Sequence, residues 1–246
     1  MSDNGEEPVV QTSFRPELSR TDLPRTTQAL EVSAFLFLIV PSMILSLFAV
    51  GRGSQGFAVT AVSVILRDLA LASLVLFFVW RNREPLSAIG WTVRDWLRQA
   101  GLGVLLFPLI FVGIGLVASQ LTRLGLSHPH SQLKAALSVK SLWQAPLAIL
   151  LVIVVAVTEE TIFRGYLLLR FIAISRNRPF AILLSTVVFA MGHGYEGEVG
   201  VVAVALLGLV FAVIYLSTGS LVAPIVMHFL QDFITVVVVP LFTNGQ

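Results

Sequence analysis

The stretch that decides the fold is LWQAPLAILLVIVVAVTEETIFRG, residues Leu142–Gly165. Its first part, Leu142–Thr158, carries no charged side chain, and the run then reaches Glu159, Glu160 and Arg164. A continuous apolar run of this kind is typical of a helix that crosses a membrane, which needs about 20 residues. Ionisable groups at membrane depth are costly, so they indicate a functional site. The stretch therefore predicts a membrane helix that runs into a group of ionisable residues.

The composition of the whole chain places it in the same class. Of the 246 residues, 56% are hydrophobic and only 12% are charged, with a net charge of +2. The mean hydropathy is +0.89, which excludes a soluble globular enzyme and also a disordered chain. The chain has no cysteine, which excludes disulfides, cysteine nucleophiles, zinc–thiolate sites and iron–sulfur clusters. No basic run predicts a nucleic-acid partner.

The apolar runs are long and continuous, without the alternation of a membrane β-barrel. The predicted fold is all-α: a polytopic transmembrane helical bundle of about seven spans, within a range of six to eight. The predicted spans are Val32–Gly51, Phe57–Trp80, Gln99–Thr122, Leu142–Thr158, Pro179–Gly192, Val199–Leu216 and Leu221–Leu241. Residues 1–28 are polar and contain three prolines, and they predict a disordered cytoplasmic tail.

The basic residues predict the orientation of these spans. With seven spans, ten arginines fall on the side of the N-terminus and four basic residues fall on the other side. Basic loops stay in the cytoplasm, so the N-terminus is predicted to be cytoplasmic and the C-terminus to lie outside. The composition, rich in Val, Leu, Ala and Arg with few lysines, favours a bacterial plasma membrane.

Three segments place polar side chains within the last spans. In TEETIFRG, Glu160 and Arg164 are four residues apart and can pair on one helix face, while Glu159 lies about 100° around the helix. In FAMGHG, His193 follows a short span, and in HFLQD, His228 and Asp232 share a face. The alternative interpretations are an interfacial ion-pair cluster, a capping histidine and a structural pair.

Other polar residues receive a structural interpretation. Arg67 and Asp68 are adjacent in span 2 and are interpreted as structural pairing across the bundle, and His128 and His130 as surface residues of a loop. By helix rise, His193 lies roughly 20 Å along its span and His228 only about 10 Å into the last span. The three segments can therefore converge only if the helices are tilted or staggered.

The three segments in this order resemble the CAAX protease and bacteriocin-processing family, also called Abi or Rce1-like, whose pattern is EExxxR, FxxxH and HxxxN or HxxxD. The matching residues are Glu159-Glu160…Arg164, Phe189…His193 and His228…Asp232, and Leu86–Trp91 is similar to a linker of such proteins. The resemblance covers about residues 142–240. Together with the predicted tail and spans, it divides the chain into three parts: the tail 1–28, helices 1–3 within 29–141, and a catalytic core within 142–246.

The resemblance implies an intramembrane endopeptidase of glutamate type. Glu159 would be the general base and would hold the attacking water with His193, while Glu160 and Arg164 would support Glu159. His228 and Asp232 would form the oxyanion site. The eukaryotic CAAX proteases carry Asn where this chain has Asp232, so Asp232 must be protonated or must orient His228. No cofactor is expected, and zinc on Glu159, His193, His228 and Asp232 is the less favoured alternative because the chain has no HExxH.

The expected partners are a membrane-associated peptide or protein substrate and the lipid bilayer, while the oligomeric state is not determined by the sequence. Two other functions compete with the protease. A noncatalytic immunity or peptide-binding protein could use the polar cluster as a capture site, and a proton-coupled transporter could use it as a relay. The absence of an internal repeat and the small number of spans argue against the transporter.

Overall fold

The structure is a computed structural model that describes residues 23–48, 56–92, 94–126, 137 and 139–243. His128 and His130 lie outside the described residues. Within this part of the chain all regular structure is helical, which confirms the all-α class. The main helices are α1 (Arg25–Phe48), α2 (Phe57–Arg81), α3 (Trp96–Arg123), α5 (Ala145–Glu160), α6 (Leu169–Ser175), α7 (Arg178–Met191), α8 (Gly197–Thr218), α9 (Val222–Asp232) and α10 (Val239–Thr243). Shorter segments are η1 (Leu86–Ile89), η2 (Leu142–Gln144), η3 (Thr161–Leu168), η4 (Gly194–Glu196) and η5 (Phe233–Val238).

Each of the seven predicted spans corresponds to one continuous helical rod. Five rods among the described residues are long and apolar enough to cross a membrane, and α7 is a shorter apolar helix. The five are Phe57–Arg81, Trp96–Arg123, Leu142–Ser175, Gly194–Thr218 and Val222–Phe242. α1 occupies the position of the first predicted span. The protein is therefore described as a multi-pass bundle.

The predicted disordered tail is too long at its C-terminal end. α1 begins at Arg25, inside the stretch 1–28, and residues 1–22 lie outside the described residues. Its first turns are tied down because Gln28 donates a hydrogen bond to the carbonyl of Leu23 and because Glu31 is buried. Polar contacts, which an apolar-run criterion does not detect, extend the helix beyond the predicted start of span 1.

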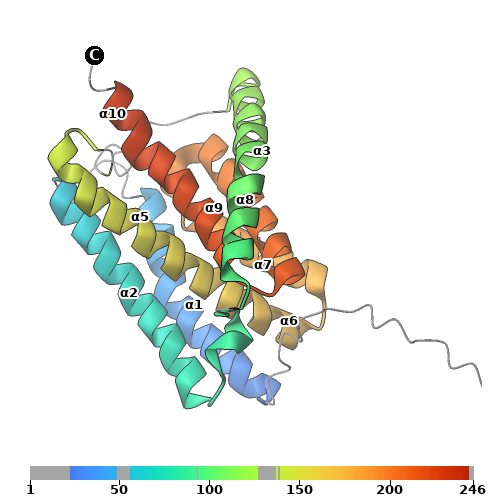
Figure 1. The fold of residues 1–246 in the computed structure, drawn as a ribbon. Coiled ribbons are helices and arrows are strands. Elements are labelled where there is room, and N and C mark those ends of the chain that lie inside the picture. The colour runs from blue at the N-terminus through green and yellow to red at the C-terminus, as the bar shows by residue number, and fades with distance from the viewer. Residues whose placement is uncertain (1–22, 49–55, 93, 127–136, 138, 244–246) are drawn as a thin grey trace, which may run out of the picture.

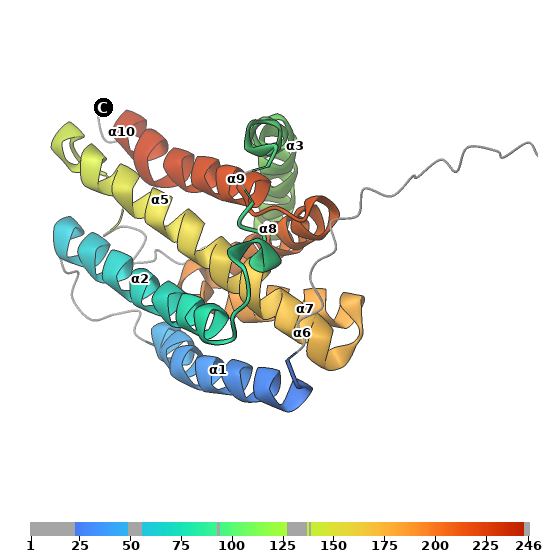
Figure 2. The same cartoon turned by 60° about the horizontal axis from the view of Figure 1, so that its bottom comes forward.

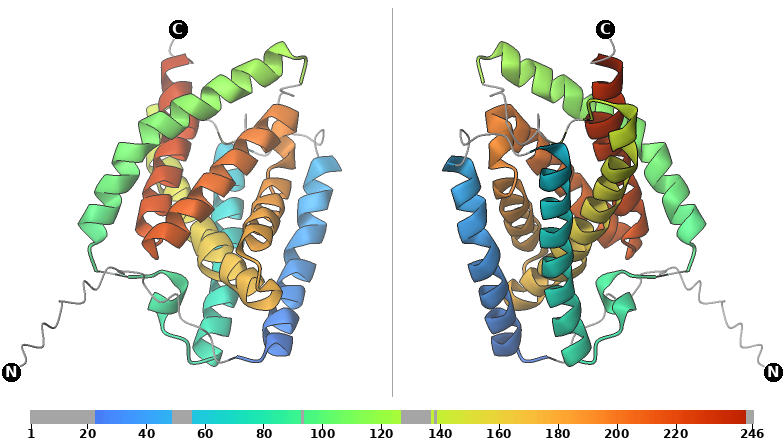
Figure 3. Two further views of the ribbon diagram at one scale, coloured as in Figure 1. Left: turned by 90° about the vertical axis from the view of Figure 1, so that its right-hand side faces the viewer. Right: turned by 90° about the vertical axis from the view of Figure 1, so that its left-hand side faces the viewer.

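The rod formed by α5, η3 and α6 lies at the centre of the bundle. Figure 2 shows α5 between α2 and α9, and both helices pack along it. α7 packs against α8 and η3, while α3 crosses obliquely over α8 and α9 at the periphery (Figure 1). The described start of α1 and the end of α10 lie at opposite ends of the bundle (Figure 3), as an odd number of crossings requires.

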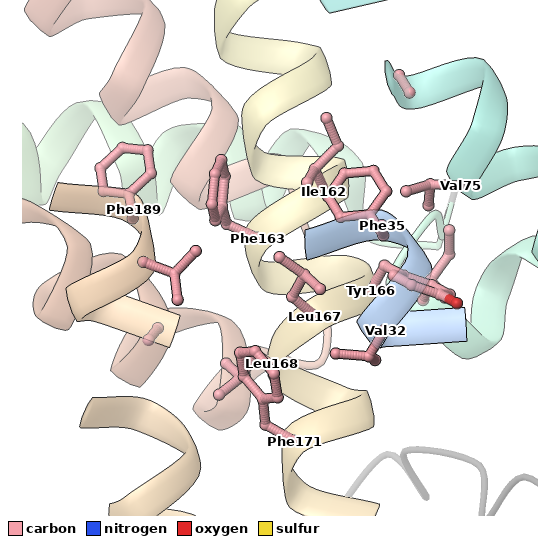
Figure 4. Close-up of a cluster of buried hydrophobic side chains, with 14 of the residues drawn as sticks. Val32, Phe35, Val75, Ile162, Phe163, Tyr166, Leu167, Leu168, Phe171 and Phe189 are labelled. Carbon is pink, nitrogen blue, oxygen red and sulfur yellow. The ribbon is translucent and has the colours of Figure 1, made fainter. Parts of the chain in front are cut away.

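The largest hydrophobic core surrounds η3, whose eight residues are all buried. Figure 4 shows Phe35 of α1 and Val75 of α2 close to Ile162 and Tyr166 of the central rod. On the other side Phe163 meets Phe189 of α7, with ring centroids 5.0 Å apart. Side chains from both halves of the chain thus fix the position of η3.

Both rods that carry paired polar motifs change from α- to π-helix at the motif, within EExxxR in the central rod and directly after HxxxD in α9. α5 ends at Glu160 and continues as the π-helix η3, and α9 ends at Asp232 and continues as the π-helix η5. π-helical segments are rare and occur frequently at functional sites. The sequence analysis predicted uninterrupted spans and did not predict these transitions.

The turn between α8 and α9 lies inside the bundle rather than at its end. In Figure 3 the start of α9 stands well above the lower ends of α1 and α2. The segment around η1 fills the space below it, because the amide of Leu221 donates to the carbonyl of Gly90 over 3.0 Å. Gly90 has a φ of 88°, and a Cβ there would meet Tyr215 at 2.5 Å. This recessed turn brings His228 to the depth of His193.

A polar cluster also lies near the end of the bundle where α2 finishes. Glu31 accepts hydrogen bonds from Arg81, from Asn82 over 2.8 Å and from the hydroxyl of Tyr166 over 2.8 Å. The neighbouring Arg170 donates to both carboxylate oxygens of Glu84 and lies over the Tyr166 ring. We call these six residues the end cluster, and it connects α1, α2 and the central rod.

Candidate active site

A hydrogen-bonded chain of buried side chains joins the central rod to α9. Glu160 accepts a hydrogen bond from Nη1 of Arg164 over 2.8 Å, and the same oxygen lies 2.8 Å from Nδ1 of His228. Glu160 and Arg164 are 0% and 1% exposed, so the ion pair predicted from their spacing is confirmed in a fully buried setting. The contact between Glu160 and Nδ1 fixes the orientation of the His228 ring.

The other ring nitrogen of His228 faces two more carboxylates. Nε2 lies 3.4 Å from Oδ2 of Asp232 and 3.8 Å from Oε2 of Glu159. Asp232 is one helical turn further along α9, as the spacing of four predicted. His228 therefore lies between an acceptor at Nδ1 and acceptors at Nε2.

Glu159 differs from its neighbour in its surroundings. Its side chain is 14% exposed, and its Oε2 is buried without a hydrogen-bond partner among the described residues. His193 and Asp232 lie within electrostatic range of its carboxylate. A buried carboxylate oxygen without a protein donor is expensive unless water or a ligand satisfies it.

Phe189 holds the aromatic and cationic groups of the site together. Its ring lies under the Arg164 guanidinium at 4.2 Å and contacts the rings of His193 at 4.9 Å and His228 at 6.2 Å. Its carbonyl lies 3.1 Å from Nδ1 of His193, so this nitrogen carries the hydrogen and Nε2 is left for other partners. The FxxxH spacing thus places the phenylalanine carbonyl and ring against the histidine.

The structure brings all six predicted site residues to one region of the bundle, but it connects them differently from the expectation. It joins Glu160 to Arg164 and His228, whereas the sequence analysis expected Glu160 to support Glu159. The difference arises because Glu159 and Glu160, as neighbours on a helix, point in different directions.

The interpretation of Arg67 and Asp68 as pairing across the bundle is wrong. Nε of Arg67 donates to Oδ1 of its neighbour Asp68 over 2.9 Å, so the pair lies within α2. Asp68 is buried and lies within electrostatic range of His193 and His228. The signal that could have identified it is its spacing of three and four residues from Ile65 and Ala72, both of which are buried.

The linker Leu86–Trp91 also contributes to the site, in a way that the sequence did not predict. Nε1 of Trp91 donates to Oγ1 of Thr161 over 3.2 Å, at the first residue of η3. A Cβ on Gly165 would lie 2.7 Å from the carbonyl of Ile89, so glycine is needed for this close approach. The linker thereby packs directly on the rod that carries Glu159 and Glu160.

The zinc alternative can be compared with the positions of the donors. Within the described part of the chain, no three His, Cys, Asp or Glu side chains are grouped so that they could hold a metal ion. The carboxylates at His228 are instead arranged as acceptors for its two ring nitrogens. A zinc site needs about four ligands around one point, and the metal-free mechanism stays a prediction.

Comparison with known proteins agrees with the three sequence motifs. Residues 141–234 match the family model of the type II CAAX prenyl endopeptidase Rce1-like proteins. This segment is Rce1-like. No curated protein and no solved structure matches the chain.

The Rce1-like segment extends from the start of the central rod to the first residues of η5 and contains all three motifs. The resemblance drawn from those motifs is thereby confirmed for this segment, which is similar to a peptidase family, and the described chain has five helices long and apolar enough to cross a membrane. α1, α2 and α3 lie before the segment. The Arg67–Asp68 pair and the end-cluster residues of α1 and α2 are therefore contributed from outside it.

Proposed function

We propose that the chain is an intramembrane endopeptidase of glutamate type that hydrolyses a peptide bond of a membrane-associated peptide or protein. One observation carries the proposal: Oε2 of Glu159 is buried without a hydrogen-bond partner among the described residues and lies 3.8 Å from Nε2 of His228, which is itself oriented by Glu160 and Asp232. A base with an available oxygen next to an oriented donor is the arrangement that water-mediated hydrolysis needs.

Glu159 is the general base in this proposal. It takes a proton from a water molecule while the water oxygen bonds to the substrate carbonyl carbon. His193 assists from the other side, because its Nδ1 is committed to the Phe189 carbonyl and its Nε2 remains to hold the water. The proton then passes from Glu159 to the amine as the carbon–nitrogen bond breaks, so the step needs no further reactant.

His228 stabilises the negative charge that develops on the carbonyl oxygen. Carboxylates face both of its ring nitrogens, an arrangement that favours a doubly protonated ring with a hydrogen on Nε2. That hydrogen is the donor for the oxyanion. Asp232 orients His228 and supplies counter-charge in this scheme, so its carboxylate does not need to donate a hydrogen bond itself.

Glu160 and Arg164 support His228. The guanidinium lies against the rings of Phe189 and Phe211 at 4.2 and 5.4 Å and donates to the carbonyl of Gly208 over 3.4 Å. These contacts hold Arg164 in place, Arg164 holds Glu160, and Glu160 holds His228. Because Glu160 is adjacent to Glu159 in the sequence, this chain of contacts fixes the oxyanion donor His228 relative to the base Glu159.

The charged residues of the bundle support a cytoplasmic N-terminus, which we include in the proposal. α1 begins at Arg25, α2 ends at Arg81 and α7 begins at Arg178, and these helix ends lie on one side of the bundle, whereas α3 ends at Arg123 on the other side (Figure 3). The chain has no cysteine, so single cysteines introduced at Ser87 and Leu124 can be labelled with an impermeant maleimide in intact cells. We expect labelling at residue 124 alone, and labelling at residue 87 alone would reverse the orientation.

The test is a comparison of membrane and secreted peptides from cells that express the wild type or the Glu159→Gln variant at equal level. Glutamine keeps the size of the side chain but cannot accept the proton. We expect a set of peptides to disappear in the variant while their full-length precursors accumulate. These precursors then serve as substrates for the purified protein in liposomes.

The other functions predict different results in the same experiment. A noncatalytic binding protein would give identical peptides for both chains, and a transporter would lose flux without any change in peptide products. Purified wild type should also keep its activity after treatment with a chelator. Loss of activity that added zinc restores would replace the glutamate mechanism with a metal-dependent one.

A further inference from the structure

Asp68 occupies a position that faces the interior of the bundle. The buried residues of α2 recur every three or four positions, and Asp68 is one of them. The other members of this inward stripe are apolar apart from Thr60: Phe57, Ala61, Ile65, Ala72, Val75, Phe78 and Val79. A carboxylate in the apolar stripe of a membrane helix is costly and marks a functional position.

The two oxygens of Asp68 have different surroundings. Oδ1 accepts hydrogen bonds from its neighbour Arg67, whose side chain is 58% exposed. Oδ2 is buried and has no hydrogen-bond partner in the described part of the chain. Arg67 therefore fixes the carboxylate through one oxygen and leaves the other facing the interior without a donor.

The interior beside Asp68 is the candidate active site. α2 packs along α5, which ends with Glu159 and Glu160. Glu159, His193 and His228 all lie within electrostatic range of Asp68, yet none of them forms a hydrogen bond or ion pair with it. Polar groups that face one another beyond direct hydrogen-bonding distance are commonly bridged by water.

Three buried carboxylate oxygens of the region lack donors among the described residues: Oδ2 of Asp68, Oε2 of Glu159 and Oε2 of Glu160. The other oxygen of Glu160 is held by Arg164 and His228, which leaves Asp68 and Glu159 as the pair considered for a water. We propose that Asp68 is a further catalytic residue, the second acceptor for the water that attacks the peptide bond. A water molecule has two hydrogens, so it can satisfy both oxygens at once. Its oxygen then directs a lone pair at the carbonyl carbon.

This inference rests on the proposed function and adds one residue to it. Glu159 still takes one proton of the water and delivers it to the amine, and Asp68 keeps its hydrogen bond to the other hydrogen throughout. The carbon–oxygen bond forms and the carbon–nitrogen bond breaks as before. Asp68 itself exchanges no proton, so its contribution is to orient the water.

Arg67 offers a matched control. Asp68→Asn and Arg67→Gln both remove the ion pair within α2. Only Asp68→Asn also replaces the carboxylate oxygen that would accept a hydrogen bond from the water. The measurement is kcat and KM for a precursor found with Glu159→Gln, on each variant in liposomes, together with melting temperatures. Asp68→Glu is the conservative variant, and Glu31→Gln removes a buried carboxylate far from the site.

We expect Asp68→Asn to lower kcat by about 100-fold with KM changed little, as for the loss of a group that acts in the transition state. Arg67→Gln should lower kcat by less than about tenfold, because the carboxylate remains. Asp68→Glu should recover part of the activity, and Glu31→Gln should leave kcat close to the wild-type value while lowering the melting temperature.

Two results would overturn the inference while leaving the proposed function intact. One is a folded Asp68→Asn variant with near wild-type kcat. The other is an equal loss in Asp68→Asn and Arg67→Gln that the double variant does not deepen, which would make the pair structural. If wild type and Glu159→Gln release the same peptides, the proposed function fails, and the role of Asp68 fails with it.

Discussion

The central rod passes through two clusters of buried charge, and they are built on opposite principles. In the end cluster all four carboxylate oxygens of Glu31 and Glu84 accept hydrogen bonds from side chains. In the active site Glu159, Glu160 and Asp68 each keep one buried oxygen without a donor in the described part of the chain. The two clusters lie on one rod and use the same residue types.

The difference separates a structural role from a chemical one. A buried carboxylate whose oxygens are satisfied holds helices together and has no capacity left for a ligand. A buried carboxylate with an unsatisfied oxygen destabilises the fold unless water or substrate supplies the donor. Burial and charge alone do not distinguish the clusters, whereas the count of satisfied oxygens does.

The largest effect should come from replacing one carboxylate oxygen by an amide nitrogen, through a Glu→Gln substitution, in each of the two clusters. Glu159→Gln should lower kcat by about 1000-fold, as expected for loss of a general base, without lowering the melting temperature. Glu31→Gln should do the reverse, because it disrupts bonds to Arg81, Asn82 and Tyr166. Both variants are measured in detergent for melting and in liposomes for cleavage, and similar behaviour of the two would remove the distinction.

Glu160 should combine both phenotypes, because it is the most connected carboxylate of the active site. Glu160→Ala leaves Arg164 and His228 buried without their partner. Breaking one side of a buried ion pair costs about 3–5 kcal/mol, so the folded yield should fall together with activity. Arg164→Ala should behave in the same way, and normal melting temperatures for both variants would contradict this account.

Tyr166→Phe tests the end cluster with the smallest change of shape. It removes one hydroxyl donor from Glu31 while the ring stays beneath Arg170. Loss of a hydrogen bond to a charged group costs about 1.5–3 kcal/mol. The melting temperature should fall while kcat stays near that of the wild type. A large loss of kcat in the folded variant would show that the two clusters are coupled through η3.

The smallest effect is expected from Asp232→Asn. The amide oxygen of asparagine can still accept a hydrogen bond from Nε2 of His228, which lies 3.4 Å from Oδ2 in the present chain. We expect kcat of Asp232→Asn to fall by less than about tenfold. Asp232→Ala removes the acceptor, and its kcat should fall by a factor of about 10²–10⁴. Equal activity of the two variants would show that orientation of His228 by this residue is unimportant.

The sequence predicted the spans well because lipid imposes a simple rule on length and polarity. The predicted Phe57–Trp80 and Pro179–Gly192 differ from α2 and α7 by a single residue at each boundary that differs. Spacing was sufficient for the pairs within one helix, Glu160 with Arg164 and His228 with Asp232. Such pairs depend only on helical periodicity, which a sequence displays directly.

The order of the three motifs also indicated the peptidase family, which the family comparison supports for residues 141–234. The sequence did not predict which side chains of different helices contact one another. The contact of Glu160 with His228 joins residues 68 positions apart, and that of Tyr166 with Glu31 spans 135. No local pattern encodes which of two adjacent carboxylates meets a distant histidine.

By itself, then, the sequence determined an all-α membrane bundle, its spans and the positions of the three polar motifs along them, because apolar length and helical spacing are local properties. The tertiary structure decided which of these groups touch, because the recessed turn at Leu221 and the π-helix η3 set the depth and direction of the side chains. It also decided that one oxygen of the buried Asp68 has no hydrogen-bond partner among the described residues and that both oxygens of Glu31 accept hydrogen bonds. These outcomes depend on the packing of distant helices, where the number of donors available to each buried oxygen is fixed.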